Sequence, residues 1–228
     1  FIAVLAHELK SPLNAIEGFL TTVIEHNAGD NPAVYQEMLR RSVARLRFMR
    51  KMIVDLLDLT RIESGQRKRE IARINLGELA RATVDTVSED AAERHIAVAL
   101  DCPDDAAMDA DRSELEILLN NLVSNAVKYN REAGSVTIQI ERDEETVRIA
   151  VSDTGIGMSP EESARLFNDF VRIKNEKTFG IPGSGLGLSI VKKIAVLYGG
   201  DVTVESVPGE GSVFRATLRD AVAGSETQ

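Results

Sequence analysis

The sequence predicts an α+β protein with two domains, an N-terminal two-helix hairpin followed by an α/β sandwich. In residues 1–66, apolar side chains recur at steps of three and four, which is the spacing of a helix face. Farther along, short runs of alternating apolar residues separate helical segments, and this pattern indicates strands. With 228 residues and a hydrophobic fraction of 43%, the chain is long enough to build two cores.

Two long helices are expected within residues 1–66, joined by a turn-rich segment at residues 26–32. The apolar row of the first helix is Ile2, Leu5, Leu9, Leu13, Ile16, Leu20 and Val23, and that of the second is Tyr35, Met38, Ser42, Leu46, Met49, Ile53, Leu56 and Leu59. Because two helices bury too little apolar surface alone, these rows predict that two copies pair into a four-helix bundle. We therefore expect a homodimer.

The second half predicts a mixed α and β domain at residues 76–220, after a linker at 67–75 and before a tail at 221–228. Strands are expected at residues 96–100, 136–140, 147–153, 201–206 and 212–218, and helices at 76–87, 112–128, 160–167 and 186–198. The short gaps at 142–146 and 207–211 are typical of hairpins. They predict a largely antiparallel sheet with helices stacked on one face.

Composition excludes several classes of function. A formal charge of −9 argues against a nucleic-acid-binding surface. A single cysteine, Cys102, cannot form an intrachain disulfide, and the three histidines fit no metal-binding pattern, so a reducing, cytoplasmic setting is expected. The sequence contains no run of about 18 apolar residues, which is the length that predicts a membrane-spanning helix. The helical pattern is already under way at Phe1, so we expect a piece of a longer protein, and any membrane anchor would lie upstream.

His7 is the first candidate for chemistry. It follows Leu5 by two positions, so a helix turns it away from the apolar row and toward water. A neutral imidazole has a free lone pair that can attack phosphorus, and the long side chain of Glu8 could take up a proton beside it. Pro12 bends the helix next to this histidine. The alternative is that His7 and Glu8 are only solvated surface residues.

Ser11 lies one helical turn after His7 and projects from the same face. Its hydroxyl could hold a water for phosphate hydrolysis. In an alternative role it would hydrogen bond back to the His7 carbonyl and ease the bend at Pro12.

A polar stripe is expected on the helix at residues 112–128, where Asn121, Asn125 and Lys128 share one face. The opposite face carries the apolar residues Leu115, Leu118, Leu119, Leu122 and Ala126. Asparagine is a poor helix former, so this stripe indicates a task other than helix stability. An amide oxygen suits Mg²⁺, and the lysine adds charge toward a phosphate. A merely solvated face is the alternative.

Asp153 continues the inward row of a strand that begins with Val147. A carboxylate there needs a hydrogen-bond donor, and an amino-bearing heterocycle would supply one. Gly155 and Gly157 follow and let the backbone approach a ligand closely. A tight turn without a ligand explains the glycines but leaves the inward carboxylate unexplained.

A glycine-rich segment, residues 183–187, precedes the last helix, where backbone amides could hold a phosphate. The loop at 174–182, with Arg172, Lys174 and Lys177 around it, is interpreted as a mobile lid over a polyphosphate. An ordinary surface loop is the alternative.

Together these segments resemble the sensor histidine kinases of bacterial two-component signalling. Residues 7–13 resemble the phosphoacceptor H box, 121–129 the N box, 153–157 the G1 box, 167–170 the F box and 183–187 the G2 box. The five motifs occur in the family's order, which makes the resemblance specific.

The resemblance implies a dimerisation and histidine phosphotransfer domain at residues 1–66 and an ATP-binding domain of the Bergerat type at residues 76–220, with ATP and Mg²⁺ as cofactors. His7 would accept a phosphoryl group and pass it to an aspartate of a separate response regulator. By position, Asn125 would hold the metal, Asp153 would accept from the adenine amino group and Arg172 would approach the terminal phosphate. The remaining nucleotide-binding positions would be Asn121, Lys128, Tyr129, Gly155, Gly157, Gly183, Gly185, Leu186 and Gly187.

Two departures from the family pattern stand out. Ser11 replaces the commoner Thr or Asn, which leaves a phosphatase activity open. The segment at 180–183 carries Pro182, which would stiffen the lid.

Two other classes are kept as alternatives. An ATPase of the topoisomerase or mismatch-repair type would share the nucleotide fold, but His7 with Pro12 argues against it. A dimeric scaffold with a decayed nucleotide site is disfavoured by four intact positions, namely Asn125, Asp153, Gly155 and Gly185.

Overall fold

The chain forms two compact units, which are described separately. A computed structural model describes residues 2–64, 69–144, 146–173, 175, 177–178, 181 and 183–220. The first unit comprises Phe1–Leu57 and Pro182–Ser184, and the second comprises Asp58–Ile181 and Gly185–Gln228, with the sheets and the other helices. Residues 65–68, which include the start of the expected linker, and the expected tail (221–228) lie outside the described residues, and so do five positions of the expected lid, namely Lys174, Glu176, Phe179, Gly180 and Pro182.

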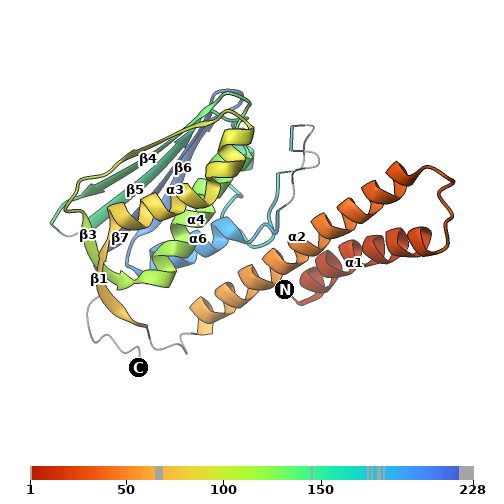
Figure 1. Cartoon of the computed structure of the whole chain (residues 1–228). Helices are drawn as coiled ribbons and strands as arrows, with labels where there is room; N and C mark the ends of the chain where they lie inside the picture. The colour runs from red at the N-terminus through yellow and green to blue at the C-terminus, as the bar shows by residue number, and fades with distance from the viewer. Residues whose placement is uncertain are drawn as a thin grey trace. The chain divides into compact units, whose positions relative to one another are not determined.

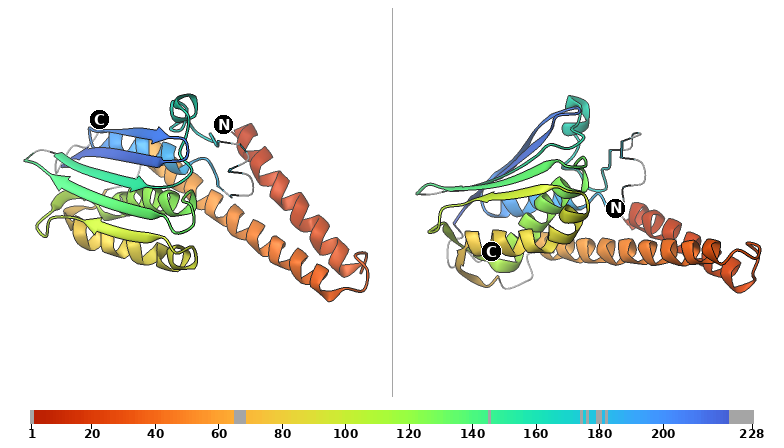
Figure 2. Two further views of the ribbon diagram at one scale, coloured as in Figure 1. Left: turned by 90° about the horizontal axis from the view of Figure 1, so that it is seen from above. Right: turned by 45° about the horizontal axis from the view of Figure 1, so that its top comes forward.

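The first unit is the predicted hairpin of α1 (Ile2–Ile24) and α2 (Pro32–Ser64), which lie side by side in Figures 1 and 2. Their connection reverses at Gly29, whose φ is +80°. Tyr35 Oη closes the turn, since it donates to the Gly29 carbonyl at 2.8 Å and accepts from the Ala28 amide at 3.2 Å. Pro12 lies inside α1, as the sequence predicts.

The predicted apolar rows are only partly covered within a single chain. Ile16 is buried, whereas Leu13 is 52% and Leu46 is 53% exposed. Other large apolar side chains on the hairpin are also exposed, namely Val4, Leu20, Ile24, Val34, Leu39, Val43, Ile53, Val54 and Leu57. So many exposed large apolar side chains on one hairpin indicate an interaction surface.

The second unit is built on a five-stranded sheet in the order β2-β4-β5-β7-β6, with helices on one face (Figure 2). The strands are β2 (Ala97–Asp101), β4 (Ser135–Arg142), β5 (Thr146–Asp153), β6 (Asp201–Val207) and β7 (Gly211–Arg219). All neighbours are antiparallel except β2 and β4, which pair in parallel. The expectation of a largely antiparallel sheet is therefore confirmed, with β2 as the exception.

A second, two-stranded sheet was not anticipated. Strand β1 (Ile71–Asn75) pairs antiparallel with β3 (Ala107–Asp111), and Ile74 lies opposite Met108. The segment expected as a linker therefore includes a strand.

The helices of the second unit agree with the prediction to different degrees. Helix α4 (Arg112–Lys128) has the predicted bounds, and its first turn is capped by Asp111, which accepts from the Ser113 amide at 2.9 Å. Helices α3 (Leu76–Glu93) and α6 (Gly187–Leu197) lie where they are expected, although α3 is longer. Helix α5 (Pro160–Ser163) is a single turn, shorter than the predicted helix at 160–167.

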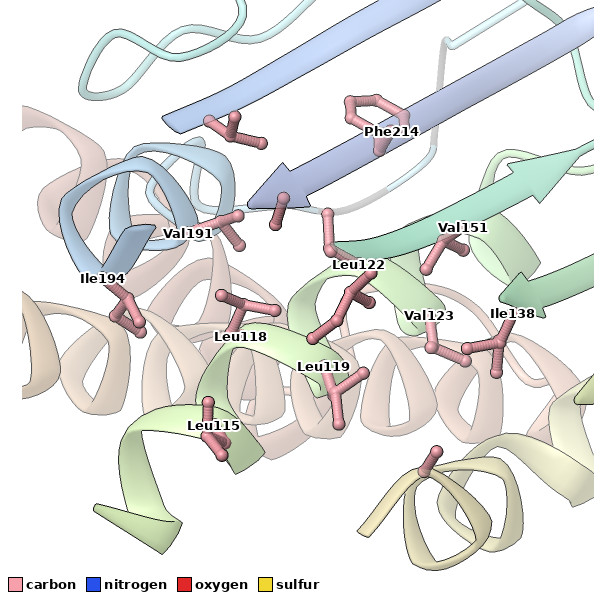
Figure 3. Close-up of a cluster of buried hydrophobic side chains, with 14 of the residues drawn as sticks. Leu115, Leu118, Leu119, Leu122, Val123, Ile138, Val151, Val191, Ile194 and Phe214 are labelled. Carbon is pink, nitrogen blue, oxygen red and sulfur yellow. The ribbon is translucent and has the colours of Figure 1, made fainter. Parts of the chain in front are cut away.

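The core lies between the sheet and the helices. Figure 3 shows the labelled leucines of α4, with Val191 and Ile194 of α6, facing apolar side chains of the strands such as Val151 and Phe214. The apolar face predicted for α4 is confirmed, since Leu115, Leu118, Leu119 and Leu122 are fully buried and Ala126 nearly so. Each leucine contributes about 1.5–3 kcal/mol by leaving water. The polar face of α4 is thereby directed away from the sheet.

Both ends of α4 are held by charged side chains. At its start, Glu114 accepts from Arg69 Nη2 at 2.7 Å and from the hydroxyl of Tyr198 at 2.6 Å. Burial and the adjacent Glu114 raise the pKa of Tyr198, so the hydroxyl remains a donor. At the end of α4, Arg94 donates to the carbonyls of Val127 at 2.8 Å and Asn130 at 2.6 Å. Such contacts fix the position of the helix within the unit.

Among the described helices, none combines the length and the apolar character that crossing a bilayer requires.

Candidate phosphoacceptor and nucleotide sites

His7 lies on α1 with its side chain exposed, as the sequence predicts. Leu5 and Leu9, on either side of it along the chain, are half-buried, and so is Glu8. Ser11 is exposed one turn farther on, and its hydroxyl makes no hydrogen bond to any residue that the structure describes. In this structure the Ser11 hydroxyl therefore does not make the hydrogen bond back to the His7 carbonyl that its alternative role requires. This face of α1 presents an accessible imidazole and an accessible hydroxyl.

The asparagines on α4 differ in their surroundings. Asn121 is buried rather than exposed, and its Nδ2 donates to the Ile117 carbonyl at 2.8 Å. Its Oδ1 lies against Gly187, where a Cβ atom would overlap it. The alternative of a merely solvated face therefore does not hold at Asn121, because the start of α6 packs against it.

Asn125 is half-buried, and its side-chain amide makes no hydrogen bond within the described part of the chain. Its oxygen is therefore available to an incoming ligand. Lys128 Nζ donates to the Tyr129 hydroxyl at 3.0 Å and lies 4.5 Å from the centroid of that ring. The two side chains form one polar and aromatic edge next to Asn125.

Asp153 ends β5 in the predicted inward row, in which Val147, Ile149 and Val151 are fully buried. Burial raises the pKa of the Asp153 carboxyl to about 6, although the backbone amides of Gly155 and Ser212 donate to it and oppose the shift. The Gly155 amide lies 2.8 Å from Oδ1. A desolvated carboxylate of this kind is further stabilised by any donor that a ligand brings.

The glycines of the G1 segment are required by close backbone packing. A Cβ at Gly155 would overlap the Tyr129 carbonyl, so the turn after β5 lies directly against the end of α4. Gly157 has a φ of +60°, and a Cβ there would overlap the Val207 carbonyl. These glycines therefore allow close packing of backbone on backbone, and their expected close approach to a ligand stays a prediction.

The glycine-rich segment before α6 joins the same region. Gly185 has a φ of +74°, and a Cβ there would lie 2.8 Å from the carbonyl carbon of Phe170. Leu186 is fully buried at the start of α6, and Gly183 and Gly187 on either side of it are half-buried. Gly187 contacts Asn121, as described above. The N, G1 and F segments therefore meet the Gly185–Gly187 part of the G2 segment within the second unit.

The loop between the F and G2 segments is described only in part. Arg172 Nη2 donates to the Ile181 carbonyl at 2.7 Å, so its guanidinium is engaged within the loop. Thr178 is buried, and its hydroxyl accepts from the Asn175 amide at 3.0 Å, while Lys177 is exposed. The described part of the loop therefore contains a closed turn.

No three His, Cys, Asp or Glu side chains converge on a metal-binding arrangement in the described residues. An Mg²⁺ site here would rely on an amide such as that of Asn125 and on oxygen atoms that a ligand supplies.

Three residues near the site were missed by the sequence reasoning. Asn130 and Thr154 bridge α4 and the G1 turn, and Arg94 caps α4 from a position on the other side of β2 in the sequence. Asn130 stands two residues beyond the predicted helix, where a small amide is typical of a cap. The sequence does not reveal that the side chain of Asn130 bonds to Thr154.

Two family models match the chain. Residues 1–65 match the His Kinase A (phospho-acceptor) domain, and residues 110–222 match the histidine kinase-, DNA gyrase B- and HSP90-like ATPase. The chain belongs to the sensor histidine kinases. The match to the phospho-acceptor domain separates this kinase from the gyrase-type ATPases, which were kept as an alternative above.

The similarity to curated relatives extends over nearly the whole length of this chain. It is 33% identical over 217 residues to the circadian input-output histidine kinase CikA of Synechococcus elongatus, which covers 94% of this chain and 29% of that protein. It is 30% identical over 221 residues to the sensor histidine kinase WalK of Bacillus subtilis, covering 96% of this chain and 36% of that protein. The chain therefore spans well under half the length of these two curated relatives.

A solved structure of the histidine kinase ThkA in complex with the response regulator protein TrrA is similar to this kinase, with a TM-score of 0.77 and 26% identity. The match covers 96% of this chain and 61% of that chain. The α+β architecture with a helical hairpin before an ATPase unit is thus the architecture of the family.

Proposed function

We propose that this chain transfers the terminal phosphoryl group of ATP to His7 and then passes it to an aspartate of a response regulator. The observation that carries the proposal is that one chain holds both an exposed histidine on α1 and a half-buried carboxylate, Asp153, beside glycine turns. The first can accept a phosphoryl group and the second can read an adenine. The two matched family models support this pairing.

At the acceptor, an exposed neutral imidazole of His7 attacks the terminal phosphorus with its ring lone pair, and the bond from that phosphorus to the bridging oxygen breaks. ADP leaves with the electron pair of that bond. Glu8 lies beside the histidine and takes up the proton that the ring releases.

At the nucleotide site, Asp153 accepts a hydrogen bond from the adenine amino group. Lys128 adds positive charge toward the phosphates, and the backbone around Gly185 and Gly187, at the start of α6, approaches them. Asn121 and Tyr129 border this region, and Arg172 would have to leave the Ile181 carbonyl to reach a terminal phosphate.

Mg²⁺ would be held by the free amide oxygen of Asn125 together with phosphate oxygens. When bound, it neutralises charge that develops on the phosphates during transfer. The unpaired amide of Asn125 fits this role, whereas the amide of Asn121 is already used within the helix.

Two partners follow from the proposal. A second copy of the chain would cover the exposed apolar row of the hairpin, which includes Leu13 and Leu46, in a four-helix bundle. A response regulator would receive the phosphoryl group, as the complex of ThkA with TrrA suggests by analogy. Ser11 would hold a water during any dephosphorylation of that regulator.

The test is labelling with ATP that carries radioactive phosphate in its terminal position. Wild type should take up label that is lost in acid and kept in base. His7→Gln should bind ATP with unchanged affinity but take up no label. The matched control is His26→Gln, another exposed histidine of the same hairpin, which should label normally. Label retained on His7→Gln would place the acceptor elsewhere.

A further inference from the structure

The side chain of Asn130 is a buried hub just beyond the end of α4. Only 4% of the residue is exposed, and its amide makes four hydrogen bonds. Nδ2 donates to the carbonyls of Ala126 at 3.1 Å and Ser135 at 3.0 Å. Oδ1 accepts from the Arg131 amide at 2.9 Å and from the Thr154 hydroxyl at 3.2 Å. Since an amide supplies two donors and one acceptor oxygen, no other side chain of this size could replace it.

Thr154 is the partner of this hub on the G1 turn. Its hydroxyl donates to Asn130 and accepts from the Ser135 amide at 2.8 Å. Its own amide donates to the Ser135 carbonyl at 3.1 Å. Two residues farther on, the backbone is bonded to the end of α4 again, because the Ile156 amide donates to the Tyr129 carbonyl at 3.1 Å.

The space around this pair is filled. A Cβ at Gly134 would overlap Asn130 Oδ1 and would lie 2.8 Å from the Thr154 hydroxyl. A Cβ at Gly155 would overlap the Tyr129 carbonyl. The connection between α4 and the G1 turn is therefore tightly packed, and neither segment can slide past the other without breaking a buried hydrogen bond.

The elements joined in this way carry different parts of the proposed nucleotide site. Asn125 and Lys128 project from α4, whereas Asp153 ends β5. In a nucleotide, the distance between the base and the phosphate chain varies only within a limited range. The base and the phosphates can therefore bind at the same time only if α4 and β5 keep a fixed spacing. An error of about 1 Å in such spacing is costly in binding and in rate.

We propose that Asn130 and Thr154 are positioning residues, which set the distance between the adenine-reading carboxylate of Asp153 and the phosphate-binding residues Asn125 and Lys128. The inference rests on the proposed function, because it needs Asp153 to read adenine. The proposal requires no contact between either positioning residue and the nucleotide. Their effect on binding passes entirely through Asp153 and α4.

The test uses Thr154→Val in the full chain, which removes the hydroxyl while nearly keeping the side-chain shape. Binding of Mg-ATP is measured by calorimetry, and thermal unfolding is followed on the same samples. Thr154→Val should bind Mg-ATP about tenfold more weakly, and Thr154→Ser, which keeps the hydroxyl, should restore binding to within about twofold. The matched control is Thr83→Val, because the buried Thr83 hydroxyl bonds only within α3, to the Leu79 carbonyl at 3.1 Å.

A double-mutant cycle separates positioning from general destabilisation. In the Asp153→Asn background, Thr154→Val should cause less than about a twofold further loss, since the carboxylate that it positions is gone. A full additional tenfold loss would overturn the proposal, as would equal losses of affinity in Thr154→Val and Thr83→Val. Unchanged affinity in Thr154→Val would also overturn it. If Asp153→Asn alone binds ATP like wild type, the adenine assignment itself has failed, and that outcome is distinguishable from the others.

Discussion

Lowering the pH from 7 to 5 should weaken ATP binding through one group, Asp153. With a pKa of about 6, most of this carboxyl is ionised at pH 7 and most is protonated at pH 5. From the titration equation the ionised fraction falls from about ten in eleven to about one in eleven, so affinity should fall about tenfold if only the ionised form accepts from the adenine amino group. A carboxyl with an ordinary pKa would change binding by less than about 10% over this range.

The assay is calorimetric titration of the protein with Mg-ATP at several pH values between 5 and 8. Because the phosphates of ATP also titrate, the quantity to compare is the ratio of affinities of wild type and Asp153→Asn at each pH. Ligand titration cancels in this ratio. The ratio should fall about tenfold between pH 7 and pH 5, and a ratio that stays constant would refute the reasoning.

The same pKa shift has a consequence for stability without nucleotide, with a defined sign. The folded pKa lies above the unfolded value of 3.8, so the favourable contribution is fully present below pH 3.8 and is lost as the pH rises through 6. Complete loss corresponds to about 3 kcal/mol, and partial contact with solvent reduces it. Asp153→Asn should therefore be more stable than wild type at pH 8 and no more stable at pH 4. Urea unfolding at both pH values checks this, and a less stable variant at pH 8 would contradict the burial argument.

Two further predictions concern Gly187 and Ser11. Gly187→Ala should cost about 1–3 kcal/mol of stability and weaken ATP binding, because the new Cβ overlaps the buried Asn121 amide. The control in thermal unfolding and ATP titration is Gly18→Ala, whose new Cβ would meet no atom within 4 Å. Equal behaviour of the two variants would contradict the packing argument. Ser11→Ala should slow dephosphorylation of a response regulator about tenfold, and much more than it slows labelling of His7, while Ser11→Thr should preserve it. Parallel changes in the two rates of Ser11→Ala would remove Ser11 from the hydrolysis mechanism.

Features that depend on local periodicity could be predicted from the sequence. The bounds of α4 follow from an apolar face of period 3.6 and from Asp111, which caps its first turn. The inward position of Asp153 follows from the alternation of β5, because Val147 begins a row that the carboxylate ends. The exposure of His7 follows from its angle to Leu5.

Features that depend on distant partners could not be predicted. Strands β1 and β3 are short and carry charged residues such as Arg73 and Asp109, so their alternation is weak until the two segments pair. The burial of Asn121 depends on the approach of Gly187, 66 positions along the chain, which no helical wheel reveals. The role of Asn130 and Thr154 likewise depends on a hydrogen bond between residues 24 positions apart.

The prediction of α5 failed in a different way. Its start was readable, since Ser159 and Glu162 form a capping box before and within the first turn. Its end was not, because the chain leaves the helix after Ser163 so that Leu166 can be buried and Phe167 can pack on the core. Tertiary packing overrode the local helical pattern there.

The place of β7 in the sheet bears on how the kinase is made. This strand follows the other strands of its sheet in the sequence, yet it lies between β5 and β6 rather than at an edge. Until residues 211–219 have left the ribosome, β5 keeps an unpaired edge next to Asp153, and the β6 segment has no neighbour. A nascent chain, or one truncated before residue 211, therefore cannot assemble the nucleotide region and exposes an edge prone to aggregation. Folding of the five-stranded sheet is thus delayed until translation has passed residue 219.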